Sequence, residues 1–481
     1  MKKILVLSMV ATVTAVYGGF WDTVNRVQKT VETVNAVGEL INGEKKNATT
    51  QPQDAAKAKA EAEAAKRTAP VTTAASNLRT SANQVAAAAD PALIASFATA
   101  RTTATDTAVP EVSYGTVTLK KPATPEQIAE AKTTYLGDKR KLENASIRFE
   151  GKTVDDATVA ATLAAFHPAG NVSARDCAIT TLAPFALLRN LQQLSLEKID
   201  CSDMKPLAGL TRLKSVRLHY SKIGDFTPLA TLSSMRELDL YGATLSSPFT
   251  PLAACSQLES IDYYATKADP SLYDSLGDLK QVKKFQGGLS KMTSLSWLRR
   301  VPNAEDLTIF AEKLEDFDAI GTVTALKRFK GWNMSGDSMS TKLGDLKFLA
   351  NCKNLEIVEL PGSDYSNLEV LTALPKLREL SLNGAVSSLD LAFLRSIPGL
   401  ALFTISKPKG DVKGFDAVFS LKKLTSLNIQ GVPGVTSIAG LKGCAGLKEL
   451  TVSKGVFPEA EIAELDALIK SNNKYGKVRQ Y

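Results

Sequence analysis

Residues 188–252 carry a regular apolar pattern that decides the fold of the chain. Written in register, they read LRNLQQLSLEKIDCSDMKPLAG (188–209), LTRLKSVRLHYSKIGDFTPLAT (210–231) and LSSMRELDLYGATLSSPFTPL (232–252). The segments begin 22 residues apart and share apolar residues at positions 1, 4, 7 and 9, followed by a Pro-Leu pair. A fixed period of this length indicates one supersecondary unit stacked many times. The step of two between positions 7 and 9 is strand alternation, which points both side chains to one face.

The repeat extends far beyond these three segments, and we call each copy a rung. One spacing lengthens to 29 residues, across the polar stretch 331–345. The rungs that contain Phe285 and Phe329 are degenerate, because glycine occupies their second core strand position. Position 1 recurs 13 times, at Phe166, Leu188, Leu210, Leu232, Cys255, Leu279, Val301, Val323, Cys352, Leu374, Ile397, Leu421 and Cys444.

This pattern resembles the leucine-rich-repeat family, most closely its 22-residue, internalin-like bacterial type. The stretch IGDFTPL (223–229) matches the consensus IxDxxPL of that type. The resemblance covers roughly 166–452 and implies an α/β leucine-rich-repeat solenoid. Its parallel sheet of about 13 rungs is expected on the concave side, with short helices or turns on the convex side. The resemblance also implies a role in recognition rather than catalysis.

Caps are expected at both ends of the solenoid (166–454), because a stack of repeats otherwise exposes its apolar ends. Residues 112–165 combine strand-like runs with helices expected at 124–135 and 155–166, which predicts an α+β cap. Residues 455–481 contain an amphipathic helix from Pro458 to Ile469. This helix should close the last rung, and we expect the basic tail after it to be loose.

Three segments precede the N-terminal cap. Residues 1–18 have a basic start and an apolar run too short to span a membrane, which predicts a signal peptide and a secreted or periplasmic protein with no transmembrane segment. Residues 19–42 have the apolar spacing of a coiled coil, through which the chain could form homo-oligomers. A helix packed on its own protein has the same pattern. Residues 43–111 are rich in Ala and Thr and indicate a low-complexity linker or stalk.

The net charge and the positions of the cysteines indicate which partners and disulfides to expect. The net charge of +8 is spread along the chain without dense basic blocks, so we expect no nucleic-acid binding. Three cysteines, Cys255, Cys352 and Cys444, lie several rungs apart at position 1 and are interpreted as small buried apolar residues. In contrast, Cys177 and Cys201 lie in adjacent rungs and could form a disulfide.

Catalytic and metal-binding motifs are not evident. The chain has only two histidines, His167 and His219, and no Cys-x-x-Cys, P-loop or GxSxG motif. The acidic pair Asp155 and Asp156 falls at an expected helix start, where capping explains it. We therefore expect no enzyme activity, no cofactor and no metal site.

Aromatic and charged residues gather at two outward positions of successive rungs. The position after the second core residue carries an aromatic ring in five of six rungs from His219 to Trp332. Aromatic rings flanked by charges are typical of binding hot spots. We therefore predict a ligand-binding face on the concave sheet, formed by His219, Tyr241, Tyr264, Phe310, Trp332, Arg217, Asp239 and Asp262. The rings could instead pack on one another and stiffen the sheet, or contact the stretch 331–345.

The predicted function is non-enzymatic recognition of a protein, or of a surface glycan, on this concave face. The alternative is a structural protein of the cell envelope that oligomerises through residues 19–42. Fold alone does not identify the ligand.

Overall fold

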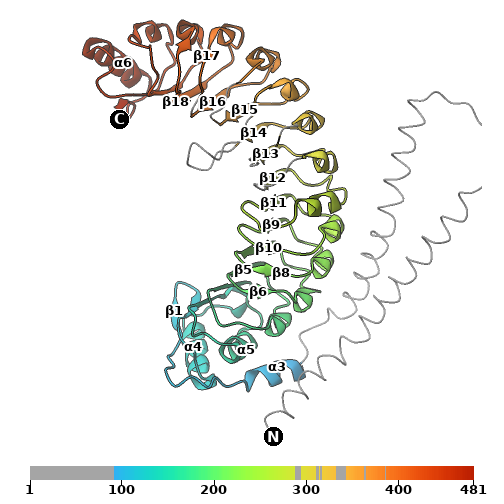
Figure 1. Ribbon diagram of the computed structural model, residues 1–481. Helices are drawn as coiled ribbons and strands as arrows, with labels where there is room; N and C mark the ends of the chain where they lie inside the picture. The colour runs from blue at the N-terminus through green and yellow to red at the C-terminus, as the bar shows by residue number, and fades with distance from the viewer. Residues whose placement is uncertain are drawn as a thin grey trace, which may run out of the picture. The chain divides into compact units, whose positions relative to one another are not determined.

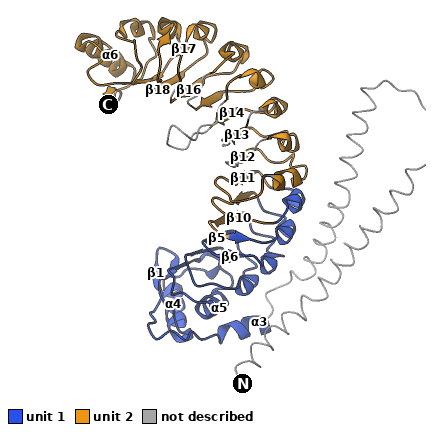
Figure 2. Cartoon of the chain, viewed as in Figure 1, with its two compact units in different colours: residues 1–216, 222–235, 247–257 blue, residues 217–221, 236–246, 258–481 orange. Residues whose placement is uncertain are grey.

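The computed structural model describes residues 91–287, 294–309, 314, 317–331, 343–361, 365–384 and 386–481. The predicted signal peptide, the helix at 19–42, most of the linker, Phe310 and Trp332 lie outside these residues. The chain divides into two compact units: unit 1 comprises 1–216, 222–235 and 247–257, and unit 2 comprises 217–221, 236–246 and 258–481 (Figure 2).

The described part of unit 1 contains the predicted cap and the first rungs of the solenoid, whose strands pair side by side. Strands β1 and β2 form an antiparallel hairpin, and the pairs β2–β3, β3–β4 and β4–β5 are parallel. The stretch 113–121, one of the strand-like runs of the cap, contains the hairpin turn and is not one continuous strand. Tyr114 and Gly115 both have positive φ, 47° and 82°, as a tight hairpin turn requires. The bounds are β1 (Glu111–Ser113), β2 (Thr116–Leu119), β3 (Ser146–Glu150), β4 (Asn171–Arg175) and β5 (Gln193–Glu197).

Helices of unit 1 begin where the sequence predicts. Helix α4 (Pro125–Gly137) has a capping box, in which Thr124 accepts a hydrogen bond from the Gln127 backbone N–H and the Gln127 side chain accepts one from the Thr124 N–H. Helix α5 (Asp156–Ala165) has Asp155 as its N-cap, which accepts from the Thr158 N–H at 2.9 Å. Helix α3 (Pro91–Ala98) lies within the range predicted as linker and contacts α5 (Figure 1).

Every rung of the solenoid except the last turns back through a short 3₁₀-helix. An acidic or hydroxyl side chain often accepts a backbone hydrogen bond two residues further on, as Asp225 does from Thr227 N–H at 2.8 Å. This explains the Asp of the IxDxxPL pattern. In unit 1 the 3₁₀-helices are η1 (Leu142–Asn144), η2 (Ala183–Leu187), η3 (Lys205–Leu207), η4 (Thr227–Thr231) and η5 (Thr250–Ala254). In unit 2 they are η6 (Pro270–Ser275), η7 (Ser296–Arg300), η8 (Asp318–Thr322), η9 (Lys347–Leu349), η10 (Leu368–Ala373), η11 (Ala392–Ser396), η12 (Phe415–Ser420) and η13 (Ala439–Gly443).

Unit 2 contains a parallel sheet that lines its concave side, with the 3₁₀-helices on the convex side (Figure 2). Alternate strand residues are buried, as in β16, where Leu380 and Leu382 are each 1% exposed. Its strands are β9 (Glu237–Asp239), β11 (Ser260–Asp262), β12 (Lys284–Gly287), β13 (Asp306–Ile309), β14 (Arg328–Gly331), β15 (Ile357–Leu360), β16 (Glu379–Asn383), β18 (Leu402–Ser406), β20 (Ser426–Gln430), β21 (Glu449–Val452) and β22 (Val478–Gln480). Strand β7 (Ser215–His219) contributes Arg217 and His219 to this unit.

In some rungs a second strand of two residues follows the main strand. Strand β6 pairs in parallel with β8 in unit 1, and β17 pairs in parallel with β19 in unit 2. Their bounds are β6 (Asp200–Cys201), β8 (Lys222–Ile223), β10 (Thr244–Leu245), β17 (Leu389–Asp390) and β19 (Val412–Lys413).

Larger side chains nearby fill the core space that the glycines of the degenerate rungs leave open. A Cβ at Gly287 would lie 2.1 Å from the ring of Tyr263, which is 1% exposed and occupies the core space of the next rung. The Tyr263 ring also lies 4.6 Å from that of Phe285 and 4.7 Å from that of Tyr273. A Cβ at Gly331 would similarly meet Leu343 and Pro361, each at 2.9 Å. The missing side chains are therefore replaced, and packing continues through both rungs.

All five cysteines are reduced thiols. The possible bridge between Cys177 and Cys201 is not formed. As predicted, Cys255, Cys352 and Cys444 are fully buried, and each directs its Sγ toward a carbonyl oxygen of the preceding rung, as Cys255 does to Leu229 O at 3.3 Å. These cysteines act as small core residues with a weak donor.

The C-terminal end differs from the expectation in one respect. Four residues of helix α6 (Glu459–Asn472) were expected to close the last rung: Leu465 and Ile469 are buried, whereas Ile462 and Leu468 are half-buried. The tail after it is ordered rather than loose, because β22 pairs in parallel with β21. The Asp466 carboxylate accepts a hydrogen bond from the Val478 N–H at 3.0 Å, which ties the tail to the helix.

Candidate functional site

Six of the predicted binding residues lie on one part of the sheet in unit 2. Together with Tyr220, which the sequence analysis missed, they form what we call the tyrosine cluster. Its members come from the exits of β7, β9 and β11. The cluster consists of Arg217, His219, Tyr220, Asp239, Tyr241, Asp262 and Tyr264.

The aromatic rings of the cluster pack against one another. The Tyr241 ring lies 5.5 Å from that of Tyr264 in a stacked pair, and 5.8 Å from the His219 ring. The Tyr220 ring meets Tyr241 edge-on, at 5.2 Å and 90°. Such ring pairs stabilise the sheet beyond their area of burial. The sideways packing considered as the alternative therefore exists, and it leaves Tyr264 only 6% exposed.

Each aspartate of the cluster orients the tyrosine two residues after it. Asp239 Oδ1 accepts a hydrogen bond from the Tyr241 N–H at 3.1 Å. Asp262 Oδ1 accepts one from the Tyr264 N–H at 2.9 Å. These local bonds hold the backbone where the strand ends. The repeated Asp-x-Tyr sequence thus holds the backbone of both tyrosines in place.

The two aspartates differ in their electrostatic environment. Asp239 lies close to a guanidinium and to an imidazole: the Nε atom of Arg217 lies 3.9 Å and the Nε2 atom of His219 lies 2.7 Å from Asp239 Oδ2. Asp262 forms no ion pair with any residue that the structure describes. Burial raises the pKa of the Asp262 carboxyl; the Tyr264 N–H opposes this, and the Asp239 charge adds to it.

Tyr220 is the most exposed ring of the cluster, at 49%. Its φ of 52° lies in the left-handed region, where an aromatic residue is uncommon. Positive φ recurs one rung apart at the strand exits, at Lys198, Tyr220 and Gly242. The sequence signal was therefore available: Tyr220 occupies a position at which the next rung has glycine.

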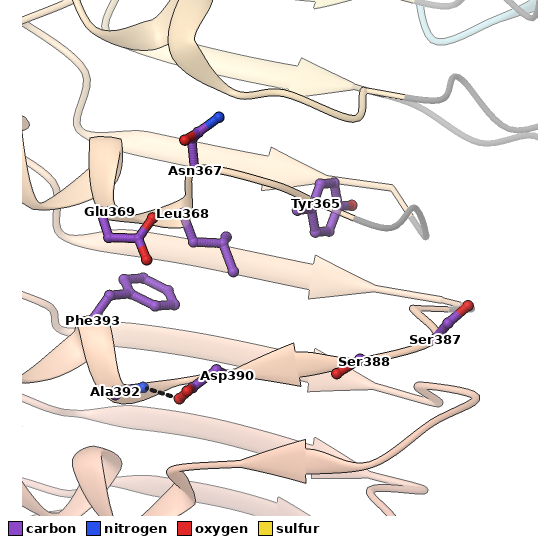
Figure 3. Close-up of a pocket in the computed structure, with 9 residues that line it drawn as sticks. All are labelled: Tyr365, Asn367, Leu368, Glu369, Ser387, Ser388, Asp390, Ala392 and Phe393. Carbon is purple, nitrogen blue, oxygen red and sulfur yellow. Dashed lines mark hydrogen bonds between the residues drawn. The ribbon is translucent and has the colours of Figure 1, made fainter.

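A second surface feature lies on the rungs that contain η10 and η11. It is a surface hollow of about 540 Å³ that the sequence did not predict, lined by Tyr365, Asn367, Leu368, Glu369, Ser387, Ser388, Asp390, Ala392 and Phe393 (Figure 3). In Figure 3, Glu369, Leu368 and Phe393 lie toward one end and Tyr365 and Ser387 toward the other. Asp390 accepts a hydrogen bond from the Ala392 N–H at 2.9 Å, and Asn367 donates one to Asp345 at 2.6 Å. Polar groups of the hollow thus stabilise the turns that enter the 3₁₀-helices.

The described residues offer neither a metal site nor a membrane-spanning helix. No group of three or more His, Cys, Asp or Glu side chains within them could hold a metal ion. Nor is any helix in that part of the chain long and apolar enough to cross a membrane.

The 22-residue rungs, their parallel strands and the IxDxxPL turns define the fold as a leucine-rich-repeat solenoid, and the repeat pattern resembles the internalin-like type. Neither a protein-family model nor a curated protein matches the sequence.

Comparison with solved structures finds proteins of the same fold. An internalin from Listeria monocytogenes is 16% identical with a TM-score of 0.44; the match covers 66% of this chain and 82% of the internalin. A leucine-rich-repeat protein of Leptospira interrogans is 16% identical with a TM-score of 0.42, covering 72% and 97%. A chain in the structure of the Toll–Spätzle complex of Drosophila is 13% identical with a TM-score of 0.51; the match covers 77% of this chain and 54% of that one. At these identities the similarity concerns the fold alone.

Proposed function

We propose that this protein is a non-enzymatic recognition protein that binds a protein partner on the concave sheet of unit 2, through the tyrosine cluster. The observation that carries the proposal is the coexistence of a half-exposed Tyr220 with partly exposed charged groups on one rigid sheet. Tyrosine is enriched at the centres of protein interfaces, because a large ring is immobilised at low entropic cost. Phe310 and Trp332 are proposed as an extension of this face.

Two features of the proposal concern the chain outside the described residues. We propose that residues 1–18 direct export, so that the partner is met in the periplasm or outside the cell. Homo-oligomerisation through residues 19–42 remains the alternative function. Light scattering of the full chain and of a variant lacking 19–42 tests it, because the alternative requires the deletion to remove a larger species.

Site-specific photo-crosslinking tests the binding face. The photoreactive amino acid benzoylphenylalanine replaces Tyr220 in one protein and Tyr475, which is 86% exposed and lies in the C-terminal tail, in a matched control. Both proteins are irradiated in envelope and cell-surface extracts. We expect a protein that is crosslinked from position 220, is not crosslinked from 475, and is lost when Tyr241→Ala is added. The same species at both positions, or none at 220, would contradict the proposal.

A further inference from the structure

Two carboxylates of the tyrosine cluster are neighbours on parallel strands. Asp262 of β11 is in register with Asp239 of β9, so both side chains stand on the same face of the sheet. Neighbouring strands are about 4.8 Å apart. Two like charges at this separation repel each other unless a positive charge lies close to them.

Among the described residues, a guanidinium lies within ion-pair distance of Asp239, and none lies within that distance of Asp262. Arg217 lies near both Asp239, at 3.9 Å, and Glu237, at 4.0 Å. On its other side Asp262 is in register with Gln286, which is neutral. Lys284 and His219 act on Asp262 only from beyond ion-pair distance. The face therefore retains one half-buried carboxylate that forms no ion pair with any of the described residues.

The tyrosine that follows this carboxylate belongs to a stack of aromatic rings. Tyr264, whose backbone N–H bonds to Asp262, stacks on Tyr241, and Tyr241 in turn meets the exposed Tyr220 ring. The face of a tyrosine ring attracts cations, and the attraction grows when the site is partly desolvated. A carboxylate next to a stack of rings is therefore complementary to a planar organic cation. A metal ion is disfavoured, because no set of three ligands is present among the described residues.

We propose that the tyrosine cluster takes an arginine side chain of the partner protein, whose guanidinium group pairs with Asp262 and lies against Tyr241. Arginine fits better than lysine, because its planar group donates two parallel hydrogen bonds to one carboxylate and stacks on an aromatic ring. Arg217 provides a precedent within the chain, since its own guanidinium lies between two carboxylates one rung earlier. This inference rests on the proposed function and specifies the chemistry of the partner.

The test uses the full chain and a fluorescein-labelled tetra-arginine peptide, with tetra-lysine and tetra-glutamine peptides for comparison. Asp262→Asn removes the charge and keeps the hydrogen bond to Tyr264, and Tyr241→Leu removes the ring. Two matched controls lie elsewhere in unit 2: Glu449→Gln removes an exposed carboxylate of β21, and Tyr475→Leu removes an exposed ring. Circular dichroism spectra establish that each variant is folded.

We expect tetra-arginine to bind more tightly than tetra-lysine, and tetra-glutamine not to bind. Asp262→Asn and Tyr241→Leu should each weaken the binding of tetra-arginine about 10-fold, whereas both controls should leave it unchanged. Equal weakening by Asp262→Asn and Glu449→Gln would indicate general charge attraction and overturn the inference. Equal binding of tetra-lysine, displacement of the peptide by calcium ions, or no binding of tetra-arginine would also overturn it.

The photo-crosslinking experiment separates this inference from the proposed function. A partner crosslinked at position 220 whose capture is unaffected by Asp262→Asn would leave the recognition role standing and overturn the arginine inference. Loss of capture with Asp262→Asn, together with loss of tetra-arginine binding, supports both.

Discussion

The ring of Tyr220 lies directly over Gly242. A Cβ added to Gly242 would lie 2.6 Å from both the Cδ1 and Cε1 atoms of Tyr220, and no real Cβ approaches a ring so closely. Both residues also have positive φ, 52° and 65°. The glycine thus allows the strained tyrosine of the preceding rung to stay against Tyr241, where it forms the exposed part of the cluster.

Gly242→Ala should therefore destabilise unit 2 through two separate effects. The left-handed backbone costs about 1–2 kcal/mol for a residue with a Cβ, and displacement of the Tyr220 ring adds about 1–3 kcal/mol. Gly434→Ala is the matched control, because Gly434 has φ 77° and nothing within 4 Å of an added Cβ. Urea unfolding of both variants should give a larger loss of unfolding free energy for Gly242→Ala.

The same pair of residues can be tested in a double-mutant cycle. In a Tyr220→Ala background the ring is gone, so Gly242→Ala should cost no more than Gly434→Ala. An equally large cost in both backgrounds would mean that the ring does not press on position 242.

Asp262→Asn should stabilise the folded protein at neutral pH. Burial, with the nearby Asp239 charge, raises the pKa of Asp262 above its ordinary value of 3.8, although the Tyr264 N–H, Lys284 and His219 oppose this. A raised pKa of an acid means that its ionised form is less favourable in the folded state, so stability falls as the pH rises through the folded pKa. The asparagine avoids this penalty and can keep the hydrogen bond to Tyr264.

Thermal melts of the parent and of Asp262→Asn from pH 3 to pH 8 check this expectation. The variant should have the higher melting temperature at neutral pH, and the two curves should converge as the pH falls toward about 3.8, where Asp262 is protonated in both states. Glu449→Gln, at an exposed carboxylate, should show no such pattern. A difference that widens on acidification would contradict the assignment of this carboxylate.

Most of the solenoid could be predicted because its rungs repeat. The two-residue step between Leu380 and Leu382 places both in the core, and position 1 is buried even where cysteine replaces leucine. The degenerate rungs could not be read in the same way, because the group that fills the space of Gly287 is Tyr263, from another rung. Compensation across rungs depends on side-chain size and direction, which a one-dimensional pattern does not contain.

The candidate site was also predicted only in part, because the sequence pattern does not contain the directions of its side chains. Alternation along the strand places His219, Tyr241 and Tyr264 outward, but it does not say that the rings cover one another, so the near-complete burial of Tyr264 was not foreseen. Tyr220 was missed because its ring is brought to the cluster by a positive φ rather than by strand alternation. The pairing of the C-terminal tail was missed because β22 is short and carries no apolar pattern.

Tyr263 and Gly287 should show strong coupling. Tyr263→Leu alone leaves a cavity in the aromatic core and should cost about 2–4 kcal/mol, and Gly287→Ala alone should cost about 1–3 kcal/mol through the clash with the ring. In the double variant the smaller leucine makes room for the added methyl group, so the loss should be less than the sum of the two. Urea unfolding of all four proteins measures the coupling. Additive losses would show that the ring does not occupy the space of the glycine.

Asp155 should make unit 1 sensitive to acid. Burial alone would raise the pKa of this carboxyl, but hydrogen bonds from Thr102 and Thr158 outweigh burial and lower it below its ordinary value of 3.8. A lowered pKa contributes stability that is complete above about 3.8 and is lost as the pH falls through the folded pKa. Asp155→Ala should cost about 1–2 kcal/mol at neutral pH, whereas Asp155→Asn should cost less, because asparagine also caps helices. Melting curves measured from pH 2 to pH 7 should give the parent a higher melting temperature than Asp155→Ala at neutral pH, and this difference should narrow in acid. A constant difference would mean that the cap does not depend on the ionised carboxylate.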